Sequence, residues 1–327
     1  MANPVFETYG TTGIRENLSD IIYNISPTDT PFISNVGKGS TKSTYTEWQV
    51  DELTAAADTP IAEGATAPDA VSATTTRVGN YTQIASKTVS VSGSNEAADA
   101  AGRASEMAYQ LAKKGMELKR DMEKTLVGTD KAQVGGSSGT ARQLASVTSW
   151  LGTNCSQGAA IADDSSTADV DEATAAPTGD GTDIAVAGST RALSAAILNQ
   201  AIEDVWVAGG DPSILMCGAK QKAAITGFDG NTTNSRKFTD AEAKKYINAV
   251  DVYVSDYGEL NVVPNRLMQT DIVLILQPDM WSVDYYRDFQ TTDLAKTGDF
   301  ESKQLLVEYT LCSKNEAASG VVRDLSV

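Results

Sequence analysis

A stripe of apolar residues constrains this chain more than any other feature of its sequence. The stripe recurs close to every fourth residue, with Gly115 filling one gap, at Met107, Leu111, Leu118, Met122 and Leu126. This spacing places the side chains on one face of an α-helix. Ser94 or Asn95 supplies an N-cap and Gly128 a stop. We therefore predict a helix of about thirty residues, on the order of 45–50 Å long. A single apolar stripe on such a rod predicts a spine that lies across a sheet.

Two strand-like segments precede this helix, with a long soft segment between them. Thr44–Asp51 and Tyr81–Ser92 are rich in Thr, Val and aromatic residues and partly alternate. Leu53–Asn80 consists mostly of Ala, Thr, Pro, Gly and Asp, so it cannot bury enough apolar surface to be held against a core. We predict a long hairpin that protrudes from the body, because loops of this length in compact domains are usually functional or disordered.

The residues before the hairpin are predicted to form an arm. One short helical turn is expected around Ile14–Ile22. Pro27 and Pro31 then push the residues before them toward extended geometry. We expect an extended segment that Phe32 and Ile33 pin to the body.

The second half is predicted to be mixed α/β and to follow an acidic, flexible insert. Cys155–Gly188 holds many Asp residues and no Lys or Arg, so we expect a solvated loop or a small inserted lobe. Ser194 then caps a helix that Gly209 and Gly210 close. Further elements are expected at Ile214–Cys217, Lys220–Ile225 (a helix), Val250–Val254, Leu260–Val263, Ile272–Leu276, Trp281–Tyr286 and Gln304–Cys312. The predicted fold class is α+β.

Charge and residue types exclude several functions. The 327 residues include 26 Lys plus Arg against 43 Asp plus Glu, a formal net charge of −17. This balance does not give the basic surface that displaces counterions from phosphates, so direct, high-affinity DNA binding is not expected. An acidic wall can still enclose DNA. The chain has no histidine, which removes Ser-His-Asp and Cys-His catalysis and His-ligated zinc sites.

The remaining motifs indicate structure rather than chemistry. Gly135–Gly139 matches the G-x-S-x-G nucleophile elbow, but no histidine is available as a base, so we interpret it as a flexible turn. The acidic insert lacks the spacing of a calcium loop. Cys155, Cys217 and Cys312 are interpreted as buried, reduced thiols. We therefore expect no catalytic, cofactor-binding or metal site.

The chain is expected to fold in the cytosol. Its first residues lack the basic and apolar regions of a signal peptide. Its longest strongly apolar run, Ile272–Leu276, is too short to span a bilayer.

Six residues are candidate contacts between subunits. Phe32 is expected to pin the arm, and Trp48 is one of four isolated tryptophans interpreted as core or interface anchors. Arg77 is the only basic residue in Leu53–Asn80. Lys113, Lys119 and Arg120 on the spine are typical of a solvated helix face, and the alternative is ion pairing with an acidic neighbouring subunit.

Several phrases along the chain resemble the HK97-like major capsid proteins of tailed bacteriophages. They are Asn17–Phe32, Asp251–Gly258, Val263–Arg266, Leu294–Asp299 and Glu308–Gly320, in the order that this family has. The resemblance covers nearly the whole chain except about Cys155–Gly188. It implies six segments: an N-arm (1–40), an E-loop hairpin (41–93), a P-domain with the spine helix (94–154), the acidic insert (155–188), a mixed α/β A-domain (189–280) and a return to the P-domain (281–327).

The resemblance also implies a function and its partners. The chain is expected to self-assemble in the host cytoplasm, as hexamers and pentamers, into an icosahedral virion shell that encloses double-stranded DNA without sequence-specific binding. A portal protein is an implied partner. The arm-like phrase begins by Asn17, so we expect scaffolding by a separate protein and no cleaved N-terminal segment. The alternatives are an encapsulin-like nanocompartment shell and, in another class, an extracytoplasmic solute-binding protein.

Overall fold

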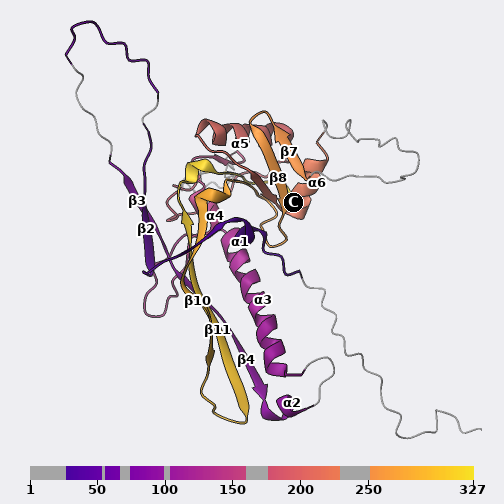
Figure 1. Cartoon of the computed structure of the whole chain (residues 1–327). Helices are drawn as coiled ribbons and strands as arrows, with labels where there is room; N and C mark the ends of the chain where they lie inside the picture. Colours follow the sequence, from indigo (N-terminus) through magenta and orange to yellow (C-terminus); the bar gives the residue numbers. More distant parts are fainter. Residues whose placement is uncertain (1–26, 54–55, 67–73, 99–103, 160–175, 229–250) are drawn as a thin grey trace, which may run out of the picture.

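The computed structural model describes residues 27–53, 56–66, 74–98, 104–159, 176–228 and 251–327. Three parts are visible in Figure 1: a long four-stranded sheet with a helix along it, a six-stranded sheet beneath further helices, and a narrow two-stranded ribbon that projects from the body. This arrangement is mixed α and β, as the sequence predicts.

The four-stranded sheet forms the elongated part of the body. Its order is β1 (Gly37–Ser40), β10 (Trp281–Asp293), β11 (Phe300–Ser313) and β4 (Gln83–Ser92). β10 and β11 form one long antiparallel hairpin, β4 pairs antiparallel with β11, and β1 pairs parallel with β10. The helix α3 (Glu106–Val127) lies along this sheet and buries its apolar stripe, with Leu118, Met122 and Leu126 at most 1% exposed. The spine predicted from the sequence is confirmed.

The start of this helix was predicted wrongly. Ser105, rather than Ser94 or Asn95, caps α3, because its hydroxyl accepts a hydrogen bond from the Ala108 amide. A separate short helix, α2 (Gly93–Ala97), precedes it and is capped by Ser92. The spine therefore has 22 residues and is about 33 Å long rather than 45–50 Å. The stop at Gly128 is confirmed.

The ribbon pairs β2 (Tyr45–Val50) with β3 (Thr76–Tyr81). The predicted hairpin paired the first strand with Tyr81–Ser92 instead, and this is wrong, because that segment is β4 of the four-stranded sheet. All of β3 except its last residue, Tyr81, lies within the stretch Leu53–Asn80 that we expected to be loop. Gly79 makes this strand difficult to predict from the sequence. A Cβ at Gly79 would meet Tyr45, the Thr46 carbonyl and Glu47 at 2.8 Å, so the close approach of the two strands requires glycine.

The six-stranded sheet has the order β5 (Cys155–Ser156), β12 (Gly320–Val322), β9 (Val273–Leu276), β6 (Ile214–Cys217), β8 (Gly258–Pro264) and β7 (Val252–Ser255). The helices α5 (Ala195–Val207) and α6 (Ala219–Thr226) pack on it, and Ser194 caps α5 as predicted. The last strand, β12, joins this sheet and not the four-stranded one. The segment 281–327 is therefore shared between the two sheets.

Two further expectations need correction. The arm is not extended at Phe32, because Pro31 starts a short helix, α1 (Pro31–Asn35), as proline at a first helical position favours. The acidic insert is not solvated throughout. Its first residues form β5, and at its other end Gly181 packs against Trp150 and the Asp183 carbonyl accepts a hydrogen bond from Ser149. The expected turn at Ile14–Ile22 and most of the acidic run lie outside the described residues.

Candidate assembly surfaces

Phe32 is an internal anchor. It lies in the short helix α1, is fully buried, and its ring meets that of Trp281 edge-on with 6.4 Å between centroids. Its backbone amide donates a hydrogen bond to the carboxylate of Glu123 on α3, at 2.7 Å. The residue pins the arm to the body as expected. It does so within one subunit.

Glu123 is a junction that the sequence analysis missed. Its fully buried carboxylate accepts hydrogen bonds from the amides of Phe32 and Ile33 and from the side-chain amide of Asn265, at 2.7, 3.0 and 2.7 Å. Burial raises the pKa of Glu123, and the three hydrogen bonds oppose that effect. One carboxylate thus joins the arm, the spine and the chain that follows β8. The only signal in the sequence is that Glu123 adjoins the apolar stripe.

Trp48 anchors the base of the ribbon. Its ring lies 5.3 Å from that of Trp150, which is part of the main core. Asn80, on the partner strand, is fully buried, donates a hydrogen bond to the Leu311 carbonyl and accepts one from the Ala145 amide. These contacts are also internal. They fasten the ribbon to the body where it leaves the sheet.

Arg77 lies on β3 and not in the tip of the hairpin. It forms an ion pair with Glu47 on the neighbouring strand, and its side chain is 66% exposed. An exposed pair of this kind contributes little to stability. Arg77 is therefore accessible on the ribbon, but its charge is already partnered within the subunit.

Three of the five basic residues of α3 share one face, while Lys114 is paired with Glu117 at 2.6 Å. Lys113, Arg120 and Lys124 follow each other at spacings of seven and four residues, with Met116 between them, which places all four on one face of the helix. This face lies opposite the buried apolar stripe. Lys119 points elsewhere, with its ammonium 5.8 Å from the Phe289 ring on β10. Within the described residues, no ion pair involves Lys113, Arg120 or Lys124. We call these three residues with Met116 the basic stripe.

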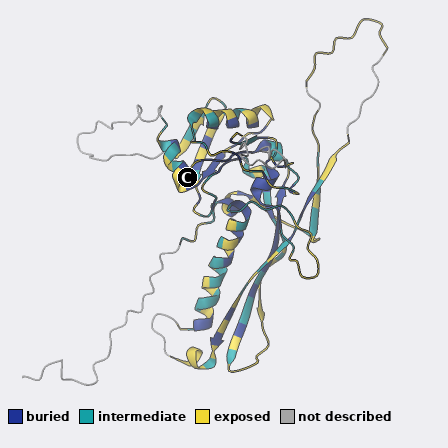
Figure 2. Ribbon diagram, turned by 180° about the vertical axis from the view of Figure 1, so that it is seen from behind, coloured by how far each residue is buried: buried dark blue, intermediate teal, exposed yellow. Residues whose placement is uncertain are grey.

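The hairpin tip carries the opposite charge. We use this name for the described residues of the loop between β2 and β3, namely 51–53, 56–66 and 74–75. It contains Asp51, Glu52, Asp58 and Glu63 and no basic residue. It also presents Leu53 and Ile61 to solvent, 99% and 64% exposed. The tip extends well beyond the body, and Figure 2 shows it exposed along its drawn length.

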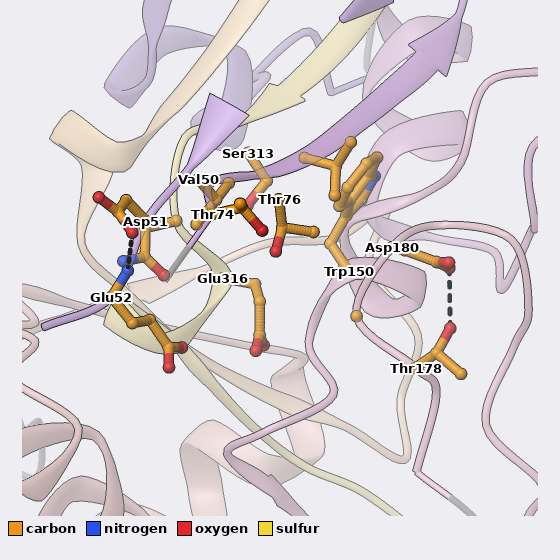
Figure 3. Close-up of a pocket in the computed structure, with 13 residues that line it drawn as sticks. Val50, Asp51, Glu52, Thr74, Thr76, Trp150, Thr178, Asp180, Ser313 and Glu316 are labelled. Atoms are coloured by element: carbon orange, nitrogen blue, oxygen red, sulfur yellow. Dashed lines mark hydrogen bonds between the residues drawn. The ribbon is translucent and has the colours of Figure 1, made fainter. Parts of the chain in front are cut away.

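A cleft of about 390 Å³ lies between the base of this loop and the body (Figure 3). Its lining includes Asp51, Glu52, Asp180 and Glu316. Two of these carboxylates already have partners, because Glu316 accepts hydrogen bonds from Gly152 and Thr153, and Asp180 accepts them from Thr178 and Thr182. Within the described residues, no group of three Asp, Glu, Cys or His side chains is placed to hold a metal ion. The cleft is acidic, and the charges of Glu316 and Asp180 serve the fold.

The glycine-rich motif is a turn, as predicted. Ser137 and Thr140 pair at the end of a small hairpin whose outer bridge joins Val134 to Gln143. Gly136 and Gly139 have φ of +73° and +99°, which other residues rarely adopt. The three cysteines are free thiols, with Cys217 and Cys312 buried and Cys155 half-buried.

Comparison with solved structures defines the fold. The chain is similar to a protein of the cyanophage A-1(L) capsid asymmetric unit, at 12% identity and a TM-score of 0.67, over 96% of this chain and 98% of that one. It is also similar to a chain of the satellite phage P4 procapsid that includes size determination (Sid) protein, at 12% identity and a TM-score of 0.53, over 93% of each chain. The fold is that of HK97-like phage capsid proteins.

Sequence comparison gives the family. Residues 5–326 match the family model of the SU10 major capsid protein. The chain is also 30% identical to the major capsid protein of Escherichia phage Phieco32 over 346 aligned positions, which include 98% of this chain and 97% of that protein. The chain belongs to the SU10 major capsid protein family.

This assignment confirms the expected function. The protein is a phage major capsid protein that self-assembles into the shell of the virion. The comparisons give no support to an encapsulin-like or a solute-binding role. In the part of the chain that the structure describes, no helix is both long and apolar enough to cross a membrane.

Proposed function

We propose that subunits join when the hairpin tip of one copy lies on the basic stripe of another. The observation that carries this proposal is that the hairpin tip and the basic stripe, two surfaces of the same chain, are complementary in charge and both expose apolar side chains. The tip presents four carboxylates and two exposed aliphatic side chains. The stripe presents two exposed lysines, the half-buried Arg120, and Met116, which is 43% exposed. The stripe spans about 16 Å along α3, which five residues of extended chain can follow.

The energetics favour an assembly of many weak contacts. An exposed ion pair contributes only about 0–1 kcal/mol, and salt screens it. Burial of Leu53 and Ile61 adds on the order of 1.5–3 kcal/mol each if both side chains become fully covered. Each subunit would give one tip and receive another, so the contact is heterologous and repeats around a closed ring.

We extend this proposal to the organisation of the particle. The subunit divides into an arm, the ribbon with its tip, a P-domain on the four-stranded sheet and an A-domain on the six-stranded sheet. Rings of six and five copies form the shell in the host cytoplasm, around double-stranded DNA that is not read by sequence. The subunit acts without enzymatic activity. A separate scaffolding protein and a portal protein assist. The similarity to a chain of the P4 procapsid, which includes a size determination protein, supports an assembly partner of this kind.

Neutralising the hairpin tip tests the docking. We expect the combined variant Asp51→Asn, Glu52→Gln, Asp58→Asn and Glu63→Gln to remain folded, because all four residues are exposed. Shell formation, followed by light scattering and negative-stain microscopy, should be lost or strongly reduced. The matched control neutralises Asp204, Asp211, Asp256 and Glu259, four exposed acids on the six-stranded part. Normal shells from the tip variant, or equal loss in the control, would contradict the proposal.

A further inference from the structure

A buried carboxylate lies where the ribbon meets the body. Glu308 on β11 is 1% exposed. Its Oε1 accepts hydrogen bonds from the Thr82 hydroxyl at 2.7 Å and from the Arg142 guanidinium at 2.6 Å, and its Oε2 accepts one from Arg287 Nε at 2.8 Å. These partners come from three separate segments: the link between β3 and β4, the small glycine-rich hairpin, and β10. One side chain therefore connects four segments.

Thr82 is the link between this cluster and the ribbon. It is the single residue between β3 and β4, it is fully buried, and its amide donates a hydrogen bond to the carbonyl of Thr44, just before β2. Both strands of the ribbon are thus tied at their base to one residue. The neighbouring Tyr81 carbonyl accepts a hydrogen bond from Thr310, two residues beyond Glu308 on β11.

The strand β10 is irregular where it contributes Arg287 to the cluster. The pairing of β10 with β11 shifts register on both sides of Arg287, which faces Glu308 across the ladder. Such irregularities re-aim a side chain. Two arginines then pair with one buried carboxylate. This arrangement is costly to disturb, because removal of a partner leaves a buried charge with fewer partners in a low dielectric.

We propose that Glu308 is a positioning residue for assembly: held by Arg142 and Arg287, it fixes through Thr82 the direction in which the ribbon leaves the body. The base of the ribbon is then fixed relative to the body. Any bending of the ribbon that differs from one subunit to another takes place on the tip side of Trp48 and Val78. Over the six residues of each ribbon strand, about 20 Å, a rotation of 10° at the base moves the far end by roughly 3–4 Å. The tip would then miss the basic stripe of the next copy, so this inference rests on the proposed docking.

Thr82→Val tests the proposal, because it removes the hydroxyl that meets Glu308 and keeps the volume, the backbone and both ion pairs. We expect the variant to fold and to show amide exchange about tenfold or more faster across residues 45–50 and 76–82 in unassembled subunits. Its shells should be several-fold fewer and mixed in diameter under the microscope. Thr82→Ser, which keeps the hydroxyl, should restore both properties.

Glu123→Gln is the matched control, because Glu123 is equally buried and does not contact the ribbon. It should leave amide exchange in the ribbon unchanged. Wild-type exchange and wild-type shells for Thr82→Val would overturn the proposal, and so would the same ribbon exchange in Glu123→Gln. Failure of the docking proposal can be distinguished from failure of this one. If docking is wrong, the variant with a neutralised hairpin tip still forms shells, whereas the amide exchange of free Thr82→Val subunits does not depend on docking.

Discussion

At the scale of single residues, buried polar groups decide how the segments of this subunit meet. Glu123 joins the arm to the spine, and Glu308 joins the ribbon to the sheet. Neither could be predicted from the sequence. Their partners are separated from them by 91 and 226 positions, and a glutamate on a helix or strand is usually a surface residue. The apolar stripe of α3, in contrast, could be predicted because its residues all lie on one face of a single helix.

Glu123 gives a prediction about pH. Its folded-state pKa is raised above the ordinary value of 4.5, so burial of the ionised form opposes folding at neutral pH. As pH falls through the folded pKa toward 4.5, the wild type should gain stability relative to Glu123→Gln, and below 4.5 the difference should be constant. Denaturant unfolding of both proteins across this range measures it. A difference that is flat or that changes in the opposite direction would contradict the account.

At the scale of elements, a helix end could be predicted where the sequence offers a single capping residue, and not where it offers several. The end of the spine at Gly128 and the start of α5 at Ser194 were predicted, because one cap signal stood at each position. The start of the spine was missed because Ser92, Ser94, Asn95 and Ser105 all offer cap side chains. Ser105 is additionally held by Glu96, which accepts hydrogen bonds from the Ser105 hydroxyl and the Met107 amide.

The cap of the spine can be tested directly. Ser105→Ala should lower the free energy of unfolding by about 1 kcal/mol, because the Ala108 amide loses its acceptor. Ser94→Ala should change it by less than about 0.5 kcal/mol. Denaturant melts of the two variants against wild type give both values. Equal costs for the two serines would favour a single helix that starts at Ser94.

The apolar stripe gives a second prediction at this scale. Leu118→Ala should cost about 2–5 kcal/mol, because the side chain is 1% exposed in the main core and leaves a cavity. Lys113→Ala, on the opposite face, should cost less than about 0.5 kcal/mol in the free subunit. Unfolding of unassembled protein separates the two. A large cost for Lys113→Ala would mean that the basic stripe is part of the fold.

At the scale of the whole molecule, the subunit combines a packed body with a protruding loop whose charge is opposite to that of one face of its spine. The hairpin could be predicted from the soft composition of Leu53–Asn80, but its strand pairing could not. Gly79 and Asn80 look like loop residues, and only their tertiary contacts make them part of β3.

The shell is expected to lack covalent cross-links. Leu53–Asn80 contains no lysine, so the protruding hairpin has no side-chain amine that could be joined covalently to a neighbouring subunit. The nearest lysines lie at the body, where Lys87 is paired with Asp121 at 2.5 Å and Lys42 precedes β2. Reduced particles boiled in SDS should therefore give one monomer band. A ladder of oligomers that survives reduction would direct attention to Lys42 and Lys87.

Docking of the hairpin tip on the basic stripe is tested most directly by disulfide trapping in assembled shells. Ile61→Cys combined with Met116→Cys places one thiol on each surface, and burial raises the pKa of the native thiols to about 11, which keeps them unreactive. After mild oxidation, non-reducing SDS gels should show oligomers for the double variant that disappear on reduction, and monomers for each single variant. Shells that form normally but give only monomers from the double variant would contradict the account.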